Sequence, residues 1–258
     1  MKITVLSENT STREGCEAEH GLSLYIKTEK HTILFDMGQT DLFAQNAEML
    51  GCDLNAVDIA ILSHGHYDHG GGISAFLSLN DHACVYHSRF AFDEYYHGED
   101  RYIGLDTALR RNKRLRPVQD KLVIDEELSI HSCNLLTRPF DMGSFGLTEK
   151  TKDGFIPDRF LHEQYLLIKE EEKRVLISGC SHKGALNLVS WFSPDVFVGG
   201  FHFSSLPEGE RLKEQAKLLN RNNTQYFTCH CTGVQQFEFM KKHMESLTYI
   251  STGSSFFV

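Results

Sequence analysis

One short stretch constrains this chain more than any other. It reads His64-Gly65-His66-Tyr67-Asp68-His69-Gly70-Gly71-Gly72 and directly follows the apolar residues 57–62. In an extended loop, side chains two positions apart point the same way, so His64, His66 and Asp68 can line one wall while His69 faces another. Imidazole nitrogens suit Zn²⁺ and related divalent ions, and the interleaved carboxylate adds an oxygen ligand for a second ion. The spacing therefore predicts a site for two divalent metal ions rather than an exposed histidine-rich loop.

The pattern H-x-H-x-D-H after a buried strand is the signature of the metallo-β-lactamase superfamily, and this chain resembles it. Four further segments resemble the branch that contains the methanopterin-pathway 7,8-dihydropterin-6-methyl-4-(β-D-ribofuranosyl)aminobenzene 5′-phosphate synthase and its bacterial relatives. These segments are Glu19-His20-Gly21-Leu22-Ser23, Ser178-Gly179-Cys180-Ser181-His182, Gly199-Gly200-Phe201-His202 and His230-Cys231-Thr232-Gly233. The resemblance implies a four-layer αββα sandwich over the whole chain, with the metal site on loops at one edge.

Strand-like and helical segments alternate along the chain, which indicates one mixed α/β (α+β) domain over residues 1–258. Helices are expected from Pro207 to Asn222 and from Val234 through Met244. No Ser-, Pro- or Gly-rich linker divides the chain, so both halves should contribute loops to one site. The expected strands lie at residues 3–6, 22–26, 32–35, 57–62, 84–87 and 121–124, and then at 165–168, 174–178, 196–198, 226–228 and 248–250.

Residues 89–118 lack strand alternation and are predicted to form an insertion. One interpretation is a solvated helical cap whose charges only keep it soluble. The other is a lid whose basic side chains meet an anionic substrate and whose aromatic side chains stack on a ring. The side chains in question are Phe90, Phe92, Tyr95, Tyr96 and Tyr102 together with Arg110, Arg111, Lys113, Arg114 and Arg116.

Two later histidines are expected to complete the metal site. His182 and His230 each come just after a predicted strand, where a turn precedes a helix. Cys180 stands where many relatives carry a bridging aspartate, so it is either a thiolate ligand or a buried packing residue. The predicted metal ligands are therefore His64, His66, Asp68, His69, His182 and His230.

The resemblance also supplies candidates for catalysis beside Asp68. It places Glu19, His20 and His202 near the metals, with Glu19 or His20 as general acid or base and His202 as a donor to a substrate oxyanion. Asp36 resembles an aspartate that orients the ligating histidines.

Three other residues near these motifs receive no ligand role. Cys229 and Cys231 do not have the spacing of a structural zinc site and are expected to face the core. His162 is assigned no role.

Composition limits the partners. The formal charge of −9 and the pI of about 5.8 argue against sequence-independent nucleic-acid binding, which needs a basic face. No apolar run approaches the roughly 18 residues of a membrane helix, and the first apolar residues are too few for a signal peptide. Seven cysteines without a framework spacing fit a reducing compartment, so a cytoplasmic protein is expected. A homo-oligomer is left open.

These features predict a metal-dependent hydrolase or a related pyrophosphate-releasing synthase. Two ions, Zn²⁺ first and Mn²⁺ or Fe²⁺ as alternatives, would polarise a substrate oxygen and hold a bridging hydroxide. The backbone N–H groups of Gly70-Gly71-Gly72 are expected to bind a phosphate or carboxylate oxygen, so the substrate should be a small anionic, phosphorylated or pterin-like molecule. Two alternatives stay open: a non-catalytic sensor on the same fold, and a di-iron oxidoreductase, although the latter carries glutamate where this chain has His66.

Overall fold

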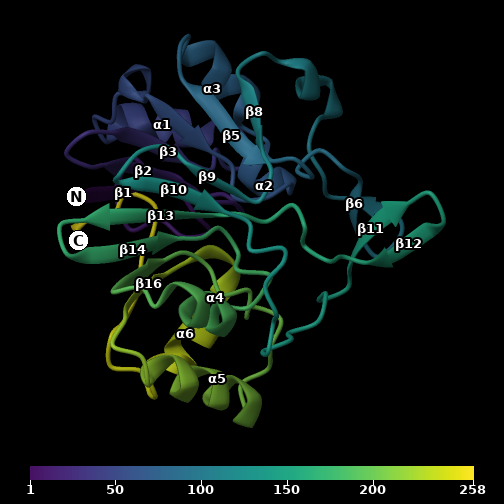
Figure 1. Cartoon of the computed structure of the whole chain (residues 1–258). Helices are drawn as coiled ribbons and strands as arrows, with labels where there is room; N and C mark the ends of the chain where they lie inside the picture. Colours follow the sequence, from purple (N-terminus) through teal and green to yellow (C-terminus); the bar gives the residue numbers. More distant parts are fainter.

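Two seven-stranded β-sheets lie face to face in the computed structural model, which describes residues 1–258 (Figure 1). The first sheet has the order β18-β1-β2-β3-β4-β5-β8. Its strands are β1 (Lys2–Ser7), β2 (Ser23–Lys27), β3 (Thr32–Phe35), β4 (Ile59–Ile61), β5 (Cys84–Ser88), β8 (Leu115–Val118) and β18 (Ser255–Phe257). The last strand returns to pair with β1, so the two termini lie close together.

The second sheet has the order β17-β16-β15-β14-β13-β10-β9. Its strands are β9 (Lys121–Val123), β10 (Leu128–His131), β13 (Tyr165–Glu170), β14 (Lys173–Ile177), β15 (Val196–Val198), β16 (Gln225–Thr228) and β17 (Leu247–Tyr249). Strands β3, β4, β5 and β8 run parallel to one another, as do β14 to β17. Because the carboxyl ends of parallel strands meet at one edge, the loops that follow them gather there.

Alternation along single strands builds the layers. In β4, Ile59 and Ile61 lie in the core between the two sheets, while Ala60 faces the opposite way. In β14, Val175 and Ile177 lie in the same core and Leu176 faces away from it. Each sheet therefore buries apolar side chains on both of its faces, as a sheet covered by helices must.

Helices cover the two outer faces. On the first sheet these are α1 (Leu42–Met49) and α3 (Ile73–Leu79), with the 3₁₀ turn η1 (Leu54–Ala56). On the second sheet they are α4 (Ala185–Phe192), α5 (Glu210–Asn220) and α6 (Val234–Lys241). The predicted αββα sandwich is thus confirmed. Helix α5 buries Leu212, Ala216 and Leu219 at the spacing that predicted it, and α6 ends before Met244.

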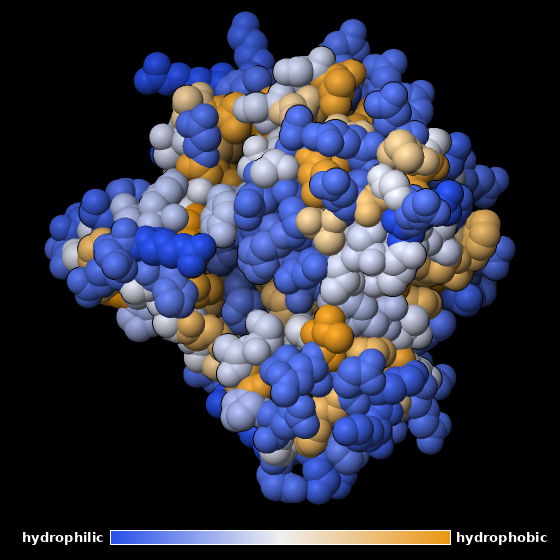
Figure 2. Space-filling view, turned by 180° about the vertical axis from the view of Figure 1, so that it is seen from behind, coloured by the Kyte–Doolittle hydropathy of each residue, from blue (hydrophilic) through white to orange (hydrophobic).

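A third, four-stranded sheet projects from the sandwich at the right of Figure 1. It has the order β12-β11-β6-β7 and consists of β6 (Tyr95–His97), β7 (Arg101–Tyr102), β11 (Leu147–Thr151) and β12 (Gly154–Pro157). Seen from behind, it protrudes on the left with a mostly hydrophilic surface (Figure 2). We call it the small sheet.

Residues 89–118, in which no strand was predicted, do contain strands. They hold β6 and β7 of the small sheet and also β8, which pairs with β5 in the first sheet; only η2 (Thr107–Arg111) is helical. The short, exposed strands carry charged and aromatic residues without strict alternation, which hid them in the sequence. Strands β10, β11, β12 and β18 were not predicted either. None of the helices has both the length and the apolar character needed to cross a membrane.

Candidate metal centre

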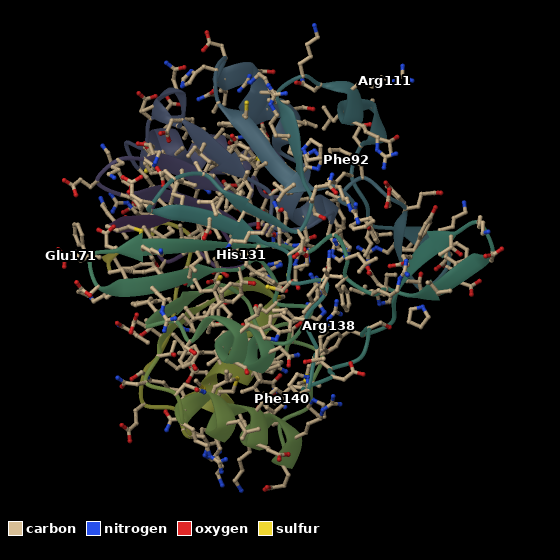
Figure 3. All side chains as sticks on the ribbon, in the orientation of Figure 1. Phe92, Arg111, His131, Arg138, Phe140 and Glu171 are labelled. Carbon is tan, nitrogen blue, oxygen red and sulfur yellow. The ribbon has the colours of Figure 1, made fainter.

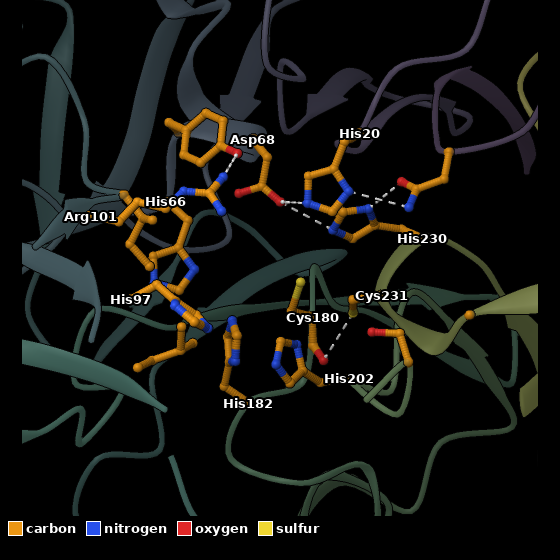
Figure 4. A pocket seen from close by; sticks show the side chains of 16 residues that line it. His20, His66, Asp68, His97, Arg101, Cys180, His182, His202, His230 and Cys231 are labelled. Carbon is orange, nitrogen blue, oxygen red and sulfur yellow. Dashed lines mark hydrogen bonds and ion pairs between the residues drawn. The ribbon is translucent and has the colours of Figure 1, made fainter. Parts of the chain in front are cut away.

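The predicted ligands meet at the edge where the parallel strands end. The loop after β4 carries His64 and His66 and leads into the short helix α2 (Tyr67–Gly70), which holds Asp68 and His69. Three later loops reach the same place: the loop after β14 carries Cys180 and His182, the loop after β15 carries His202, and the loop after β16 carries His230 (Figure 4). The second half of the chain thus contributes further candidate ligands to those of the loop after β4.

One group of candidate ligands contains His64, His66 and His182, whose ligand atoms lie within 4.8 Å of one another. The Nε2 atoms of His64 and His182 are 3.4 Å apart. All three side chains are buried. We call this the first ligand group.

A second ligand group contains Asp68, His69 and His230. The Oδ2 atom of Asp68 is 3.7 Å from His69 Nε2 and 3.3 Å from His230 Nε2, and the two imidazole nitrogens are 3.2 Å apart. Cys180 lies between the two groups, because its Sγ is 3.3 Å from His69 Nε2 and within 4.8 Å of the ligand atom of His64. The structure therefore places Cys180 at the junction of both groups.

Hydrogen bonds to Asp36 and Ser63 determine which imidazole nitrogens of His64 and His69 face the other candidate ligands. Its Oδ2 accepts hydrogen bonds from His69 Nδ1 at 2.6 Å and from the Ser63 hydroxyl at 2.7 Å. Since the Ser63 proton is used on Asp36, its oxygen must accept from His64 Nδ1, 2.8 Å away. His64 and His69 therefore both carry their proton on Nδ1 and turn a bare Nε2 lone pair into the cluster.

These lone pairs fit divalent ions. The unprotonated Nε2 of His69 faces an Asp68 oxygen and another imidazole nitrogen at distances that repel unless a cation lies among them. The imidazole of His66 has a buried Nε2 without a hydrogen-bond partner. Imidazole nitrogens and one carboxylate are the donor set that zinc-type ions prefer, so the residues present fit the group.

Burial keeps the ligands in the protonation states that metal binding needs. It lowers the pKa of His64 and of His182 well below the usual value, helped by the neighbouring imidazoles, and lowers the pKa of His66 to about 3. Burial alone would raise the pKa of Asp68, but His69, His20 and His230 together hold it well below its usual value. His64, His66 and His182 are therefore neutral and Asp68 is charged at neutral pH.

Strained backbone gathers at this edge. Asp36, His202 and His230 have φ values of 59°, 56° and 49°, in the left-handed region that non-glycine residues seldom occupy. Such strain persists only where the surrounding structure holds it, and it concentrates at functional sites.

Two buried acids brace the ligand loops from behind. Asp158 accepts from Nε2 of His162 at 3.1 Å, and His162 Nδ1 accepts from the backbone N–H of Gly65 at 2.9 Å. Both nitrogens of His162 are used, so it positions the loop of His64 and His66 and has no lone pair left for a metal. Glu163 accepts from the backbone N–H of His182 at 2.7 Å.

A cavity of about 240 Å³ opens over both ligand groups. His20, His202 and Cys231 line it together with the ligands, and His97, Arg101, Ile103 and Leu147 of the small sheet and its flank form its rim. In Figure 4, Arg101 and His97 lie on the side of the cavity away from His230. The guanidinium of Arg101 has no carboxylate partner and donates only to the Tyr67 hydroxyl, at 3.2 Å.

Of the candidate catalytic residues His20, His202 and Glu19, the first two line the cavity and the third does not. His20 lines the cavity and lies 3.2 Å from Asp68 Oδ2, and His202 lines it with a buried Nδ1 that has no partner. Glu19 does not line it: its carboxylate accepts from the backbone N–H groups of Gln39 and Thr40 at 3.0 and 3.2 Å. The expected acid–base role of Glu19 is therefore replaced by a structural one, because its oxygens hold a turn.

The expected anion site at Gly70-Gly71-Gly72 is also wrong. The N–H groups of Gly70, Gly71 and Gly72 already donate to the carbonyls of His66, Tyr67 and Gly38. A Cβ on Gly72 would lie 2.0 Å from the Met37 carbonyl oxygen, so the glycine is needed for close packing.

The sequence interpretation also misplaced some side chains. Cys229 faces the core as expected, but Cys231 lines the cavity. Among the basic residues of the expected lid, Arg111 points outward at the top of Figure 3, and Arg114 donates to backbone carbonyls.

Sequence reasoning missed Asn9, Ser63, His97 and Arg101. None of them belongs to a recognisable spacing. Only Ser63 could have been suspected from the sequence, because it directly precedes His64, the first predicted ligand.

Comparison with known proteins gives consistent results. A family model described as the metallo-beta-lactamase superfamily matches residues 17–221. The uncharacterized protein MJ0448 of Methanocaldococcus jannaschii is 28% identical, covering 90% of each chain. The 7,8-dihydropterin-6-methyl-4-(beta-D-ribofuranosyl)-aminobenzene-5'-phosphate synthase of the same organism is 26% identical over 92% of this chain and 89% of its own.

Solved structures are similar as well. Tm1679, described as a metal-dependent hydrolase of the beta-lactamase superfamily, has a TM-score of 0.86 and 28% identity, covering 100% of this chain and 99% of that one.

Proposed function

Since this chain belongs to the metallo-β-lactamase superfamily, we propose that it is an enzyme that binds two divalent metal ions and hydrolyses a small anionic substrate. The first ligand group would hold one ion and the second ligand group the other, with the Cys180 side chain lying between the two groups. A related transfer that releases pyrophosphate is the alternative chemistry, since one relative is named a synthase.

The observation that carries this proposal is the direction of the lone pairs. Asp36 and Ser63 hold the protons of His69 and His64 on the outer nitrogens, so bare Nε2 atoms converge beside the Asp68 carboxylate. A sensor that binds only a neutral ligand would not need this arrangement. Bound divalent ions would lower the pKa of water toward neutrality and polarise a substrate oxygen.

The remaining side chains of the cavity support a catalytic role. His20 can donate a hydrogen bond to Asp68, which fixes the carboxylate, and His202 lines the cavity and has a buried Nδ1 without a protein partner. We propose His20 as the group that moves a proton and His202 as the donor to a substrate oxygen.

We propose that the substrate carries a phosphate or another anionic group. Arg101 and His97 stand directly opposite each other on β7 and β6, at the rim of the cavity and without acidic partners. A guanidinium in this position can donate two parallel hydrogen bonds to phosphate oxygens. The small sheet would thus act as the lid, a role expected of residues 89–118 as a whole. Zinc is the ion that this donor set favours, and a cytoplasmic location stays our expectation.

Two measurements test the proposal together. Elemental analysis of protein reconstituted with Zn²⁺, Mn²⁺ or Fe²⁺ should give close to two ions per chain, and the loaded protein should hydrolyse bis(p-nitrophenyl) phosphate. The His82→Ala variant, altered at an exposed histidine outside the cavity, should match the unaltered protein. One ion or none, or no turnover with any metal, would contradict the enzyme proposal and favour a sensor.

A further inference from the structure

We propose that Asn9 is a positioning residue that makes His230 a metal ligand and keeps the neighbouring His20 from becoming one. The two imidazoles have ring centroids only 5.0 Å apart, and both Nε2 atoms lie near Asp68 Oδ2, at 3.2 Å for His20 and 3.3 Å for His230. By distance alone either histidine could bind an ion beside Asp68, since the ligand atoms of His20, Asp68 and His230 lie within 4.8 Å of one another. This inference rests on the proposed metal centre.

The Asn9 amide lies between the two outer nitrogens. Its Oδ1 is 2.7 Å from His230 Nδ1, and its Nδ2 is 3.3 Å from His20 Nδ1. The backbone N–H of Gly21 also points at Oδ1, at 3.4 Å, and a backbone N–H can only donate. This contact assigns the amide oxygen to the His230 side and the amide nitrogen to the His20 side.

The two histidines then take opposite tautomers. His230 donates from Nδ1 to the amide oxygen, so its Nε2 carries a bare lone pair toward Asp68 and His69. His20 accepts from the amide nitrogen at Nδ1, so its proton is on Nε2 and is donated to Asp68 Oδ2. One side chain thus produces a ligand and a hydrogen-bond donor from two adjacent histidines.

Turning the amide over leaves one contact that no metal could relieve, because the NH₂ group would then face the Gly21 N–H. It would also exchange the two tautomers, so that His20 rather than His230 would turn a bare Nε2 toward Asp68. In the orientation of the structure the amide of Asn9 has no unfavourable contact, and the repulsion in its neighbourhood lies among Asp68 Oδ2, His69 Nε2 and His230 Nε2. A cation at that point removes it, so the tautomers and the second metal position require each other.

Two substitutions at one position separate the two effects. In Asn9→Asp the carboxylate still accepts from His230 and can accept from His20, so His230 stays a ligand while His20 gains a proton on Nδ1. In Asn9→Leu, a residue of similar size, neither histidine is fixed. The full-length, Zn²⁺-loaded protein is suitable for both, because Zn²⁺ is diamagnetic and permits nitrogen NMR of the histidine rings.

The expected readouts are the ¹⁵N shifts and the metal content. Asn9→Asp should keep two ions but move the Nδ1 signal of His20 to the protonated range, with the His230 signals unchanged. Asn9→Leu should weaken binding of one ion by about 10–100-fold in a chelator competition. His31, whose ring pairs with Asp58 and Asp125, is an internal reference that should not move.

The results distinguish this inference from the proposed function. If the unaltered protein holds fewer than two ions, the metal proposal itself fails. If it holds two and Asn9→Asp leaves the Nδ1 signal of His20 unchanged, or Asn9→Leu binds both ions as tightly as before, the role of Asn9 is overturned and the metal proposal stands.

Discussion

The ligand loop after β4 and the small sheet border the same cavity, but they are built in opposite ways. His64 and His69 are completely buried. His69 is hydrogen-bonded to Asp36, and His64 is hydrogen-bonded to Ser63, which in turn donates to Asp36. Arg101 and His97 are exposed, and the one hydrogen bond that ties Arg101 to the ligand loop goes to the Tyr67 hydroxyl.

The difference teaches which task each region can perform. Burial lowers the pKa of His64 and of His66, and the hydrogen bonds to Ser63 and Asp36 fix the direction of the His64 and His69 imidazoles, which chemistry at a metal requires. An exposed guanidinium keeps its charge and its freedom to adjust, which suits recognition of an anionic group that must enter and leave. The two regions should therefore respond differently to substitution.

Loss of the carboxylate should have the largest effect. Asp68→Ala should lose one ion and lower the turnover of bis(p-nitrophenyl) phosphate by about 10²–10⁴-fold, while the protein stays folded because the lost group is not part of the apolar core. Elemental analysis, kinetics and circular dichroism measure the three quantities. Asp81→Ala, at an aspartate whose side chain is 95% exposed, is the matched control. Unchanged turnover would remove Asp68 from the centre.

The two ligands from the second half should differ in which ion they hold. His182→Ala should release the ion of the first ligand group and His230→Ala that of the second, each leaving one ion per chain. A histidine that only packs would instead leave both ions and lower the free energy of unfolding by about 1–3 kcal/mol. Metal content measured beside thermal unfolding separates the outcomes. If His182→Ala keeps two ions, we would assign Cys180 as the ligand in place of His182. The Cys180→Ala/His182→Ala double variant would then test this assignment by its metal content.

Substitution in the small sheet should change recognition alone. Arg101→Ala should weaken binding of inorganic phosphate to the Zn²⁺-loaded protein by about 10–100-fold, since a hydrogen bond to a charged group contributes about 1.5–3 kcal/mol. Calorimetric titration measures the affinity, and metal content should remain at two ions. Arg111→Ala, at the outward-pointing arginine, should bind phosphate normally. A lost ion in Arg101→Ala would break the division between the two regions.

The smallest effect should be the contribution of His66 to the pH dependence of folding stability. Burial holds the pKa of His66 at about 3 in the folded chain, against 6.5 as its ordinary value. Between these values the unfolded chain binds the proton and the folded chain does not, so stability is retained above about 6.5 and falls as the pH decreases toward 3. The melting temperature of metal-free protein should follow this course, and His66→Gln should flatten it. An equal slope in both proteins would mean that His66 is not buried as neutral imidazole.

The sequence by itself determined the ligand loop and, through the family resemblance that this loop carries, the αββα arrangement. The loop and the single strands and helices depend on spacing within short segments: a buried strand followed by His64, His66, Asp68 and His69, and apolar side chains at strand or helix periods. Local patterns of this kind survive folding because one element contains all the residues concerned.

Only the tertiary structure decided the roles of single polar residues. Glu19 and His20 are adjacent, yet one holds a turn at Gln39 and the other reaches Asp68. Asn9 reaches His230 across 221 positions of sequence, and Arg101 reaches the cavity on a sheet whose strands are short and exposed. The role of a hydrogen-bonding group depends on which partner lies within about 3 Å of it. That partner comes from a distant segment, which no local spacing can specify.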